Sequence, residues 1–155
     1  MDDIQKLEGT VGELSSAAQY IIATIGNEQF GIDIRYIDNI VRMQRITRVP
    51  KAQKYFKGVI NLRGVVIPVM SLRIKFGLEE IENTNNTRII IIKPDKVTPL
   101  GIIVDSVREV LTIEESEMDK PDNSDARMQH IGAIGKHGDE LISILNIPSL
   151  TVDKE

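Results

Sequence analysis

Short runs of apolar residues alternate with turn-forming residues along most of this chain, which is the pattern of a mainly β protein. Residues 29–34 show the two-residue period of a strand, with Phe30, Ile32 and Ile34 on one face and Gly31 and Asp33 on the other. An irregular turn is expected over 35–40, and Pro50 ends the extended pattern that follows it. Further strands are predicted at residues 19–25, 41–49, 88–93, 100–105 and 107–111.

The central stretch, residues 58–70, consists almost entirely of apolar and turn-forming residues. Its single charge is Arg63, which stands immediately before Gly64. We predict a hairpin with a type I turn over Asn61–Gly64, because asparagine favours the first position of such a turn and glycine the last. Pro68 has no amide donor, so the second strand should be an edge strand or be bulged there.

Short elements follow each hairpin. Ser71 can cap a one- to two-turn helix over 72–76, and Gly77 would end that helix. A second hairpin is predicted from residues 131–134 and 141–145, around a turn at 136–138. The chain then closes with a short helical turn or strand over 147–152.

Glycine spacing suggests that one small β unit occurs twice. Gly31 and Gly101 occupy similar apolar contexts 70 positions apart, and the pair Gly58 and Gly64 matches Gly132 and Gly138, each 74 positions later. Two barrel-like lobes would each close their own sheet edges. A crevice between two such lobes is then the expected place for a ligand or partner.

Composition limits the kind of protein this is. The chain has 155 residues, enough for one domain or two small lobes, and contains no cysteine. A net charge of −4 and only 4% aromatic residues argue against a nucleic-acid surface. Asp2 and Asp3 do not fit a signal peptide and no apolar run approaches the roughly 20 residues of a membrane span, so we expect a cytoplasmic protein. Residues 1–17 are either a short docking helix or a frayed tail.

The sequence does not contain the common catalytic motifs, so we do not expect an enzyme. No phosphate-binding or dinucleotide-binding glycine motif is present, and no G-x-S-x-G elbow supports a serine nucleophile. His130 and His137 are separated by a glycine-rich hairpin, which does not suit a metal site, and Asp105 sits at a strand end in a turn-like context. We therefore expect neither cofactor nor metal. A binding module is the remaining class, in which Arg63 is either a solvated hairpin charge or a partner contact.

Three stretches resemble the CheW family of chemotaxis coupling proteins, with similarity extending over about residues 19–150. The longest stretch is 57–73, which includes the sequence GVINLRGVVIPVMSLR; the others are 30–34 and 101–107. The resemblance implies an all-β fold of two five-stranded SH3-like barrels with one or two short helices. We place this domain at 18–150, between tails at 1–17 and 151–155, with barrel cores at 30–86 and 88–145 and with termini that cross between the barrels.

The same resemblance implies a non-catalytic adaptor, recruited to membrane receptor arrays. Its partners would be the regulatory domain of the histidine kinase CheA and the cytoplasmic tips of methyl-accepting chemoreceptors, with other CheW-like domains in arrays left open as further partners. Nucleic acid and direct membrane insertion are not implied. By their positions relative to the family pattern, the residues expected to bind partners are Arg63, Gly58, Ile37, Asn39 and Ile89.

Two positions depart from the family pattern. Ser71 stands where an aspartate is usual, although serine can cap the same helix. Asn39 stands where a glutamate is frequent, so it could form a hydrogen bond but no ion pair with Arg63. The rival hypotheses are a small β-barrel that binds oligonucleotides or oligosaccharides, and a hydrolase that uses Asp105 or the histidines.

Overall fold

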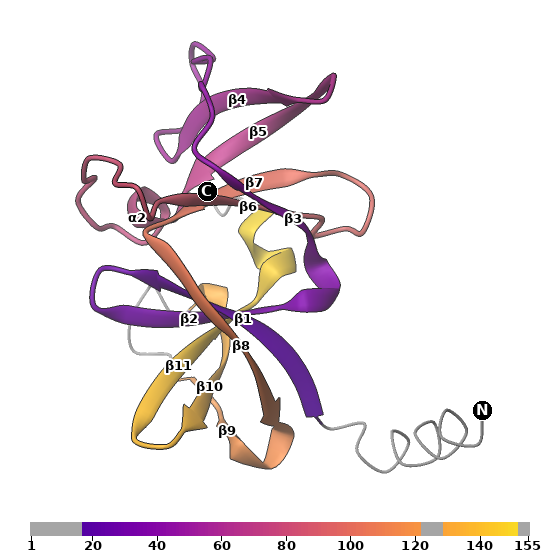
Figure 1. Cartoon of the computed structure of the whole chain (residues 1–155), viewed down its shortest axis with the longest axis vertical. Helices are drawn as coiled ribbons and strands as arrows, with labels where there is room; N and C mark the ends of the chain where they lie inside the picture. Colours follow the sequence, from indigo (N-terminus) through magenta and orange to yellow (C-terminus); the bar gives the residue numbers. More distant parts are fainter. Residues whose placement is uncertain (1–16, 122–128, 152–155) are drawn as a thin grey trace.

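The computed structural model describes residues 17–121 and 129–151, and its strands form two sheets (Figure 1). The expected N-terminal tail, apart from Ala17, and the C-terminal tail, apart from Thr151, lie outside the described residues. One sheet comprises β1 (Ala17–Ile25), β2 (Glu28–Asp33), β8 (Ser106–Glu114), β9 (Met118–Asp119), β10 (Ile131–His137) and β11 (Glu140–Leu145). The other comprises β3 (Ile37–Arg42), β4 (Phe56–Leu62), β5 (Val65–Ser71), β6 (Arg88–Ile92) and β7 (Leu100–Val104).

Helices in the described part of the chain are few and short. They include α2 (Leu72–Lys75) and the 3-10 helices η1 (Ile34–Tyr36), η2 (Glu115–Glu117) and η4 (Ile147–Thr151). The strand expected at residues 41–49 instead spans Ile37–Arg42, because η1 completes the irregular turn within three residues. Residues 43–49 form no strand beyond an isolated bridge at Thr47. Within the described part of the chain, no helix is both long and apolar enough to cross a membrane. The mainly β fold class is confirmed.

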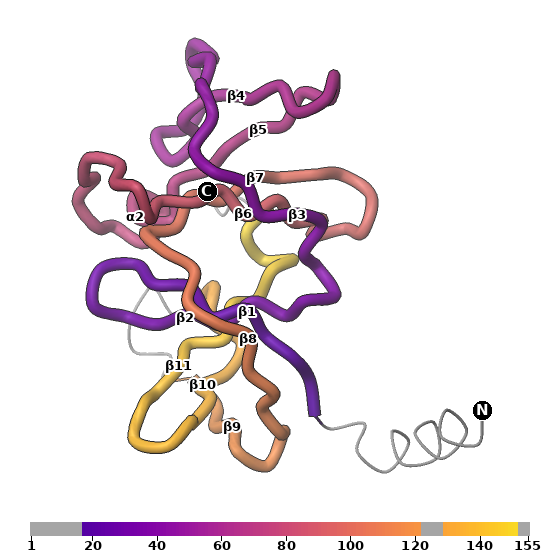
Figure 2. The backbone as a smooth tube through the Cα atoms, in the orientation of Figure 1, coloured from indigo at the N-terminus to yellow at the C-terminus, as the bar shows by residue number. Residues whose placement is uncertain are grey.

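The two sheets repeat one strand order. The orders are β8-β1-β2-β11-β10-β9 and β3-β6-β7-β5-β4, and in both a parallel contact joins two hairpins, β2 with β11 and β7 with β5. Figure 2 shows the chain beginning in the lower sheet, building the upper sheet, and returning to complete the lower one. The expected cores at 30–86 and 88–145 are therefore wrong: β6 and β7 pair with β3 and β5, which puts residues 37–104 in one sheet.

Glycines of the predicted repeat occupy corresponding places in the two sheets. Gly31 lies in β2 opposite Ile144, and Gly101 lies in β7 opposite Val69, each at the parallel contact. A Cβ atom on Gly31 would lie 2.7 Å from Ile144 Cδ1, and one on Gly101 would lie 2.9 Å from Ile89 Cγ2. The repeated glycines thus permit close packing inside each lobe.

Apolar side chains form one core inside each lobe and a larger core between the lobes. The isoleucine run of β6 serves two of them, since Ile89 and Ile91 point into their own lobe while Ile90 and Ile92 point into the shared core. A strand buried on both faces reads as a continuous apolar run. The centre of the expected crevice is therefore filled by packed side chains from both sheets.

The central hairpin forms as expected but with a different turn. Leu62 pairs with Val65, so the turn consists of Arg63 and Gly64 alone, with φ angles of +54° and +85°. Two positive φ values are typical of a type I′ turn, whose twist suits paired strands better than the type I turn predicted from Asn61. At Pro68, β5 pairs with β4 only, because its pairing with β7 begins at residue 69.

Ser71 caps α2 as predicted, and Gly77 follows the helix with φ of +77°. The Ser71 Oγ accepts a hydrogen bond of 3.3 Å from the Ile74 amide. Replacing Ser71 with alanine should lower the free energy of unfolding by about 1 kcal/mol, because that amide loses its acceptor. Urea unfolding followed by circular dichroism measures the loss; the control Ser116→Ala, at an exposed serine, should change it by less than about 0.5 kcal/mol.

Candidate functional site

The tip of the β4–β5 hairpin presents one cation beside two exposed apolar side chains. Arg63 is exposed, and Val65 and Val66 keep 51% and 60% of their surfaces accessible. The hairpin extends away from the body of the upper lobe (Figure 1). We call Arg63, Val65 and Val66 the hairpin-tip patch. Sequence reasoning found the arginine and correctly placed both valines in a strand, but it did not predict that both side chains are exposed.

The backbone at Arg63 is unfavourable for an arginine. Its left-handed conformation costs a residue with a Cβ atom about 1 kcal/mol, whereas glycine or asparagine adopts it readily. The turn itself is well supported, since the Gly64 amide donates to Asn61 Oδ1 at 2.9 Å. Turn formation therefore does not require arginine at this position, and the Arg63 side chain is exposed.

Gly58 is buried, and its lack of a side chain lets a second backbone segment approach closely. Its φ is +143°, and a Cβ atom there would lie 2.1 Å from the Thr47 carbonyl oxygen. Next to it, Thr47 and Val59 exchange two backbone hydrogen bonds of 2.8 Å, which connect the β3–β4 segment to β4. Gly58 thus permits the contact that closes this edge of the lobe.

The other expected contact residues differ in accessibility. Ile37 and Asn39 are half-buried on β3, and Asn39 Oδ1 accepts a hydrogen bond of 2.8 Å from the Ile40 amide. No hydrogen bond within the described ranges joins Asn39 to Arg63. The prediction that Ile89 contacts a partner directly is wrong, because its side chain has no accessible surface and packs inside its lobe.

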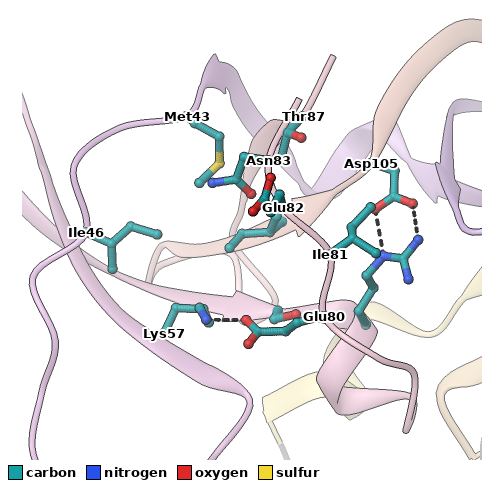
Figure 3. A pocket seen from close by; sticks show the side chains of 12 residues that line it. Met43, Ile46, Lys57, Glu80, Ile81, Glu82, Asn83, Thr87 and Asp105 are labelled. Atoms are coloured by element: carbon teal, nitrogen blue, oxygen red, sulfur yellow. Dashed lines mark hydrogen bonds and ion pairs between the residues drawn. The ribbon is translucent and has the colours of Figure 1, made fainter. Parts of the chain in front are cut away.

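A surface pocket of about 410 Å³ lies between the segment after β3 and the loop before β6 (Figure 3). Met43, Ile46 and Ile81 contribute apolar surface, and two ion pairs, Lys57–Glu80 and Arg73–Asp105, line it. Figure 3 shows the two ion pairs at separate places in the lining. Within each pair the opposite charges neutralise one another. The pocket offers a mixed, mostly neutralised surface.

Asp105 connects the two lobes at the point where the chain passes from β7 to β8. Its carboxylate accepts hydrogen bonds from Arg73 at 2.6 and 3.0 Å and from the Gly26 amide, in the β1–β2 turn, at 2.8 Å. Burial would raise the pKa of the Asp105 carboxyl, but the Arg73 and Gly26 hydrogen bonds and the guanidinium charge outweigh it and hold the pKa below its ordinary value. The carboxylate is therefore a structural anion.

This arrangement predicts acid sensitivity. A carboxyl group with a lowered pKa in the folded state stabilises the fold above its unfolded pKa of about 3.9, and this stabilisation is lost as the pH falls through the folded value. Asp105→Asn should therefore be less stable than the wild type by about 1–3 kcal/mol at neutral pH, and the difference should shrink as the pH falls below the ordinary range of an aspartate pKa. Urea unfolding across this pH range tests it. If the Arg73 pair is responsible, adding Arg73→Gln to Asp105→Asn should cost little more; a fully additive loss would contradict the pairing.

Of the residues considered for hydrolysis, Asp105 and His130 have structural partners. His130 is buried, its ring centroid lies 6.2 Å from that of Phe76, and its Nδ1 is 3.0 Å from Ser149 Oγ. That hydroxyl in turn donates to the Asn146 carbonyl oxygen at 2.7 Å. His137 is exposed in the β10–β11 hairpin, and no metal-binding group of three or more suitable side chains occurs among residues 17–121 and 129–151.

Two interwoven β lobes define this chain as a small, mainly β protein of barrel-like units. The family model for the CheW-like domain matches residues 19–155. The chain therefore belongs to the CheW-like family, as the motif around Arg63 predicted.

Relatives and a solved structure agree with this assignment. The chain is 30% identical over 155 residues to the chemotaxis protein CheW of Klebsiella aerogenes, covering 98% of this chain and 90% of that protein. It is 34% identical over 134 residues to CheW of Helicobacter pylori, covering 85% and 80% of the two chains. The crystal structure of the scaffolding protein TtCheW from Thermoanaerobacter tengcongensis superposes with a TM-score of 0.78 at 30% identity, over 83% of this chain and 88% of that one.

Proposed function

We propose that this protein is a non-catalytic chemotaxis adaptor that couples methyl-accepting chemoreceptors to the histidine kinase CheA. The main support for this proposal is the similarity to CheW proteins over nearly the whole of both chains, in sequence and in fold. An adaptor of this kind needs at least two separate contact surfaces on one rigid body. The shared core between the lobes provides such a body, because it fixes one sheet against the other.

The hairpin-tip patch is our candidate for the receptor contact. Arginine forms forked hydrogen bonds to carboxylates and carbonyl groups and is enriched among residues that dominate binding energy. Exposed Val65 and Val66 add apolar area next to the charge, as the centre of an interface requires. Gly58 supports this patch from within, by holding β4 in place.

The edge strand β3 is our candidate for the kinase contact. Ile37 and Asn39 lie on this strand, and its Asp38 forms an ion pair of 3.5 Å with Lys93 of the neighbouring segment. β3 stands at the end of its sheet order, so part of its backbone and half-buried side chains can meet a related barrel of the kinase regulatory domain. On this proposal the protein works in the cytoplasm and joins membrane receptor arrays through its partners.

A titration of isotopically labelled protein tests the proposal. Addition of a receptor-tip fragment should shift the amide resonances of residues 61–66, and addition of the kinase regulatory domain should shift those of 37–42. A complex of all three components should form without displacement of either partner. Absence of shifts with both partners would contradict the adaptor function, and overlapping surfaces with mutual displacement would contradict simultaneous coupling.

A further inference from the structure

The segment from the end of β3 to the start of β4 concentrates positive charge. Residues 42–57, which we call the basic segment, contain no aspartate or glutamate and carry a basic residue at every third position: Arg42, Arg45, Arg48, Lys51, Lys54 and Lys57. The chain as a whole has a net charge of −4, so removing these six positive charges leaves −10 for the rest. The segment is thus a local concentration of positive charge on a protein that is otherwise acidic.

Most of these charges are available to a ligand. Arg42, Arg45, Arg48, Lys51 and Lys54 are exposed, and none forms an ion pair within the residues the structure describes. Lys57 is the exception, since it pairs with Glu80. Like-charged side chains along one segment repel each other, so an anionic partner would relieve this repulsion as well as supply attraction.

Backbone contacts hold the basic segment in one shape. Thr47 exchanges two hydrogen bonds with Val59, Phe56 donates to the Gln53 carbonyl oxygen at 3.0 Å, and Ser71 donates to the Tyr55 carbonyl oxygen at 2.7 Å. Lys51 adopts a left-handed conformation, with φ of +63°, in the turn that follows Pro50. Cations mounted on such a fixed backbone lose less conformational entropy on binding than cations on a free tail.

The basic segment also forms a concave surface. A hollow of about 630 Å³ is lined by Arg48, Lys51, Lys54 and Lys57, and its single carboxylate is Glu80. Figure 2 shows the segment between β3 and β4 as the uppermost protrusion, while the β4–β5 hairpin points away to the side. The cationic surface is therefore distinct from the hairpin-tip patch.

We propose that the basic segment binds an acidic polypeptide segment, one carrying several aspartate or glutamate residues. Charges spread along a chain suit several carboxylates better than one compact anion. Nucleic acid fits less well, because base stacking needs exposed aromatic rings. The segment's rings are Tyr55 and Phe56, both half-buried, and Lys75 Nζ lies 3.8 Å from the centroid of the Tyr55 ring.

Binding of a labelled peptide of alternating glutamate and glycine to the full chain tests this proposal. Fluorescence anisotropy at about 0.02 M salt should show saturable binding that weakens strongly by about 0.3 M, where charge screening is greater. Amide shifts on binding should fall within residues 42–57. The glutamine analogue of the peptide should not bind.

Two triple variants of equal net charge distinguish a local site from bulk charge. Arg48→Gln, Lys51→Gln and Lys54→Gln together should weaken peptide binding by about tenfold or more. The control combines Arg108→Gln, Lys96→Gln and Lys136→Gln, three exposed cations outside the segment, and should change binding by less than about twofold. Equal losses in both variants, or no saturable binding to the wild type, would overturn the proposal.

Two further outcomes would assign the surface to another occupant and so overturn it. Tighter binding of an oligothymidylate of equal charge through residues 42–57 would indicate nucleic acid. Concentration-dependent dimerisation that the first triple variant abolishes would indicate a second copy of this chain. The Arg63 contact is separate from this segment, so failure of either proposal leaves the other standing.

Discussion

Gly58→Ala is expected to destabilise this protein by about 3 kcal/mol or more, a large fraction of the stability of a small domain. The added Cβ atom would lie 2.1 Å from the Thr47 carbonyl oxygen and 2.7 Å from its carbonyl carbon. Both are backbone atoms, so no side-chain rotation relieves the overlap. At φ of +143° the new side chain would also strain its own backbone.

The expected damage extends beyond residue 58. Moving Thr47 away breaks its two hydrogen bonds with Val59, and the segment they hold carries Ile46, which packs against the core of the upper lobe. Urea unfolding followed by circular dichroism measures the loss. A Gly58→Ala protein within about 1 kcal/mol of the wild type would contradict the close contact described here.

Gly64→Ala is the matched control on the same hairpin. Gly64 also has a positive φ, +85°, but nothing lies within 4 Å of its would-be Cβ atom. Only the backbone strain of about 1 kcal/mol should appear. A difference of about 2 kcal/mol between the two variants would therefore measure the steric contact with Thr47.

We expect Gly58 to influence binding without touching a partner. The family motif groups Gly58 with Arg63, and sequence alone gives no means of separating their roles. The structure places Gly58 inside the lobe and Arg63 on its surface. We therefore expect Gly58 substitutions to weaken binding only to the extent that they unfold β4.

Local patterns predicted most of the individual elements. The alternation at Phe30 and Ile32 identified β2, although Ile34 lies beyond it, exposed in η1. Ser71 with Gly77 marked the ends of α2. The assignment of strands to lobes failed, because β1 and β2 pair with strands more than 70 residues later. Pairing over such distances depends on the whole topology, which no local period encodes.

The candidate site was predicted to a smaller extent. Arg63 was recognised because a single charge in an apolar stretch is conspicuous. Ile89 was misassigned because the resemblance gave its position but not its burial, and β6 is buried on both faces. The turn type was missed because Asn61 and Gly64 fit a type I turn as well as the type I′ turn that the twist of the strands selects. The basic segment was visible in the sequence as a spacing of three, but its exposure and fixed shape came only from the structure.

Arg63→Asn should abolish most receptor affinity while leaving the fold intact. Removing an interface arginine of this kind costs about 1–3 kcal/mol of binding, or roughly a 5- to 150-fold rise in Kd. Asparagine tolerates the left-handed conformation better than arginine, so the free energy of unfolding should stay equal or rise by up to about 1 kcal/mol. Isothermal titration with a receptor-tip fragment and urea unfolding measure the two quantities separately.

Lys96→Asn provides a control with the same chemistry. Lys96 is also an exposed cation in a turn with positive φ, +67°, but it lies between β6 and β7 and outside the hairpin-tip patch. Its replacement removes one positive charge and relieves similar backbone strain, so it should leave receptor affinity within about twofold. Equal losses of affinity in both variants would mean that net charge, and not the Arg63 contact, controls binding. Loss of stability in Arg63→Asn alone would mean that the arginine supports the hairpin, and the binding role would then have to be assigned elsewhere.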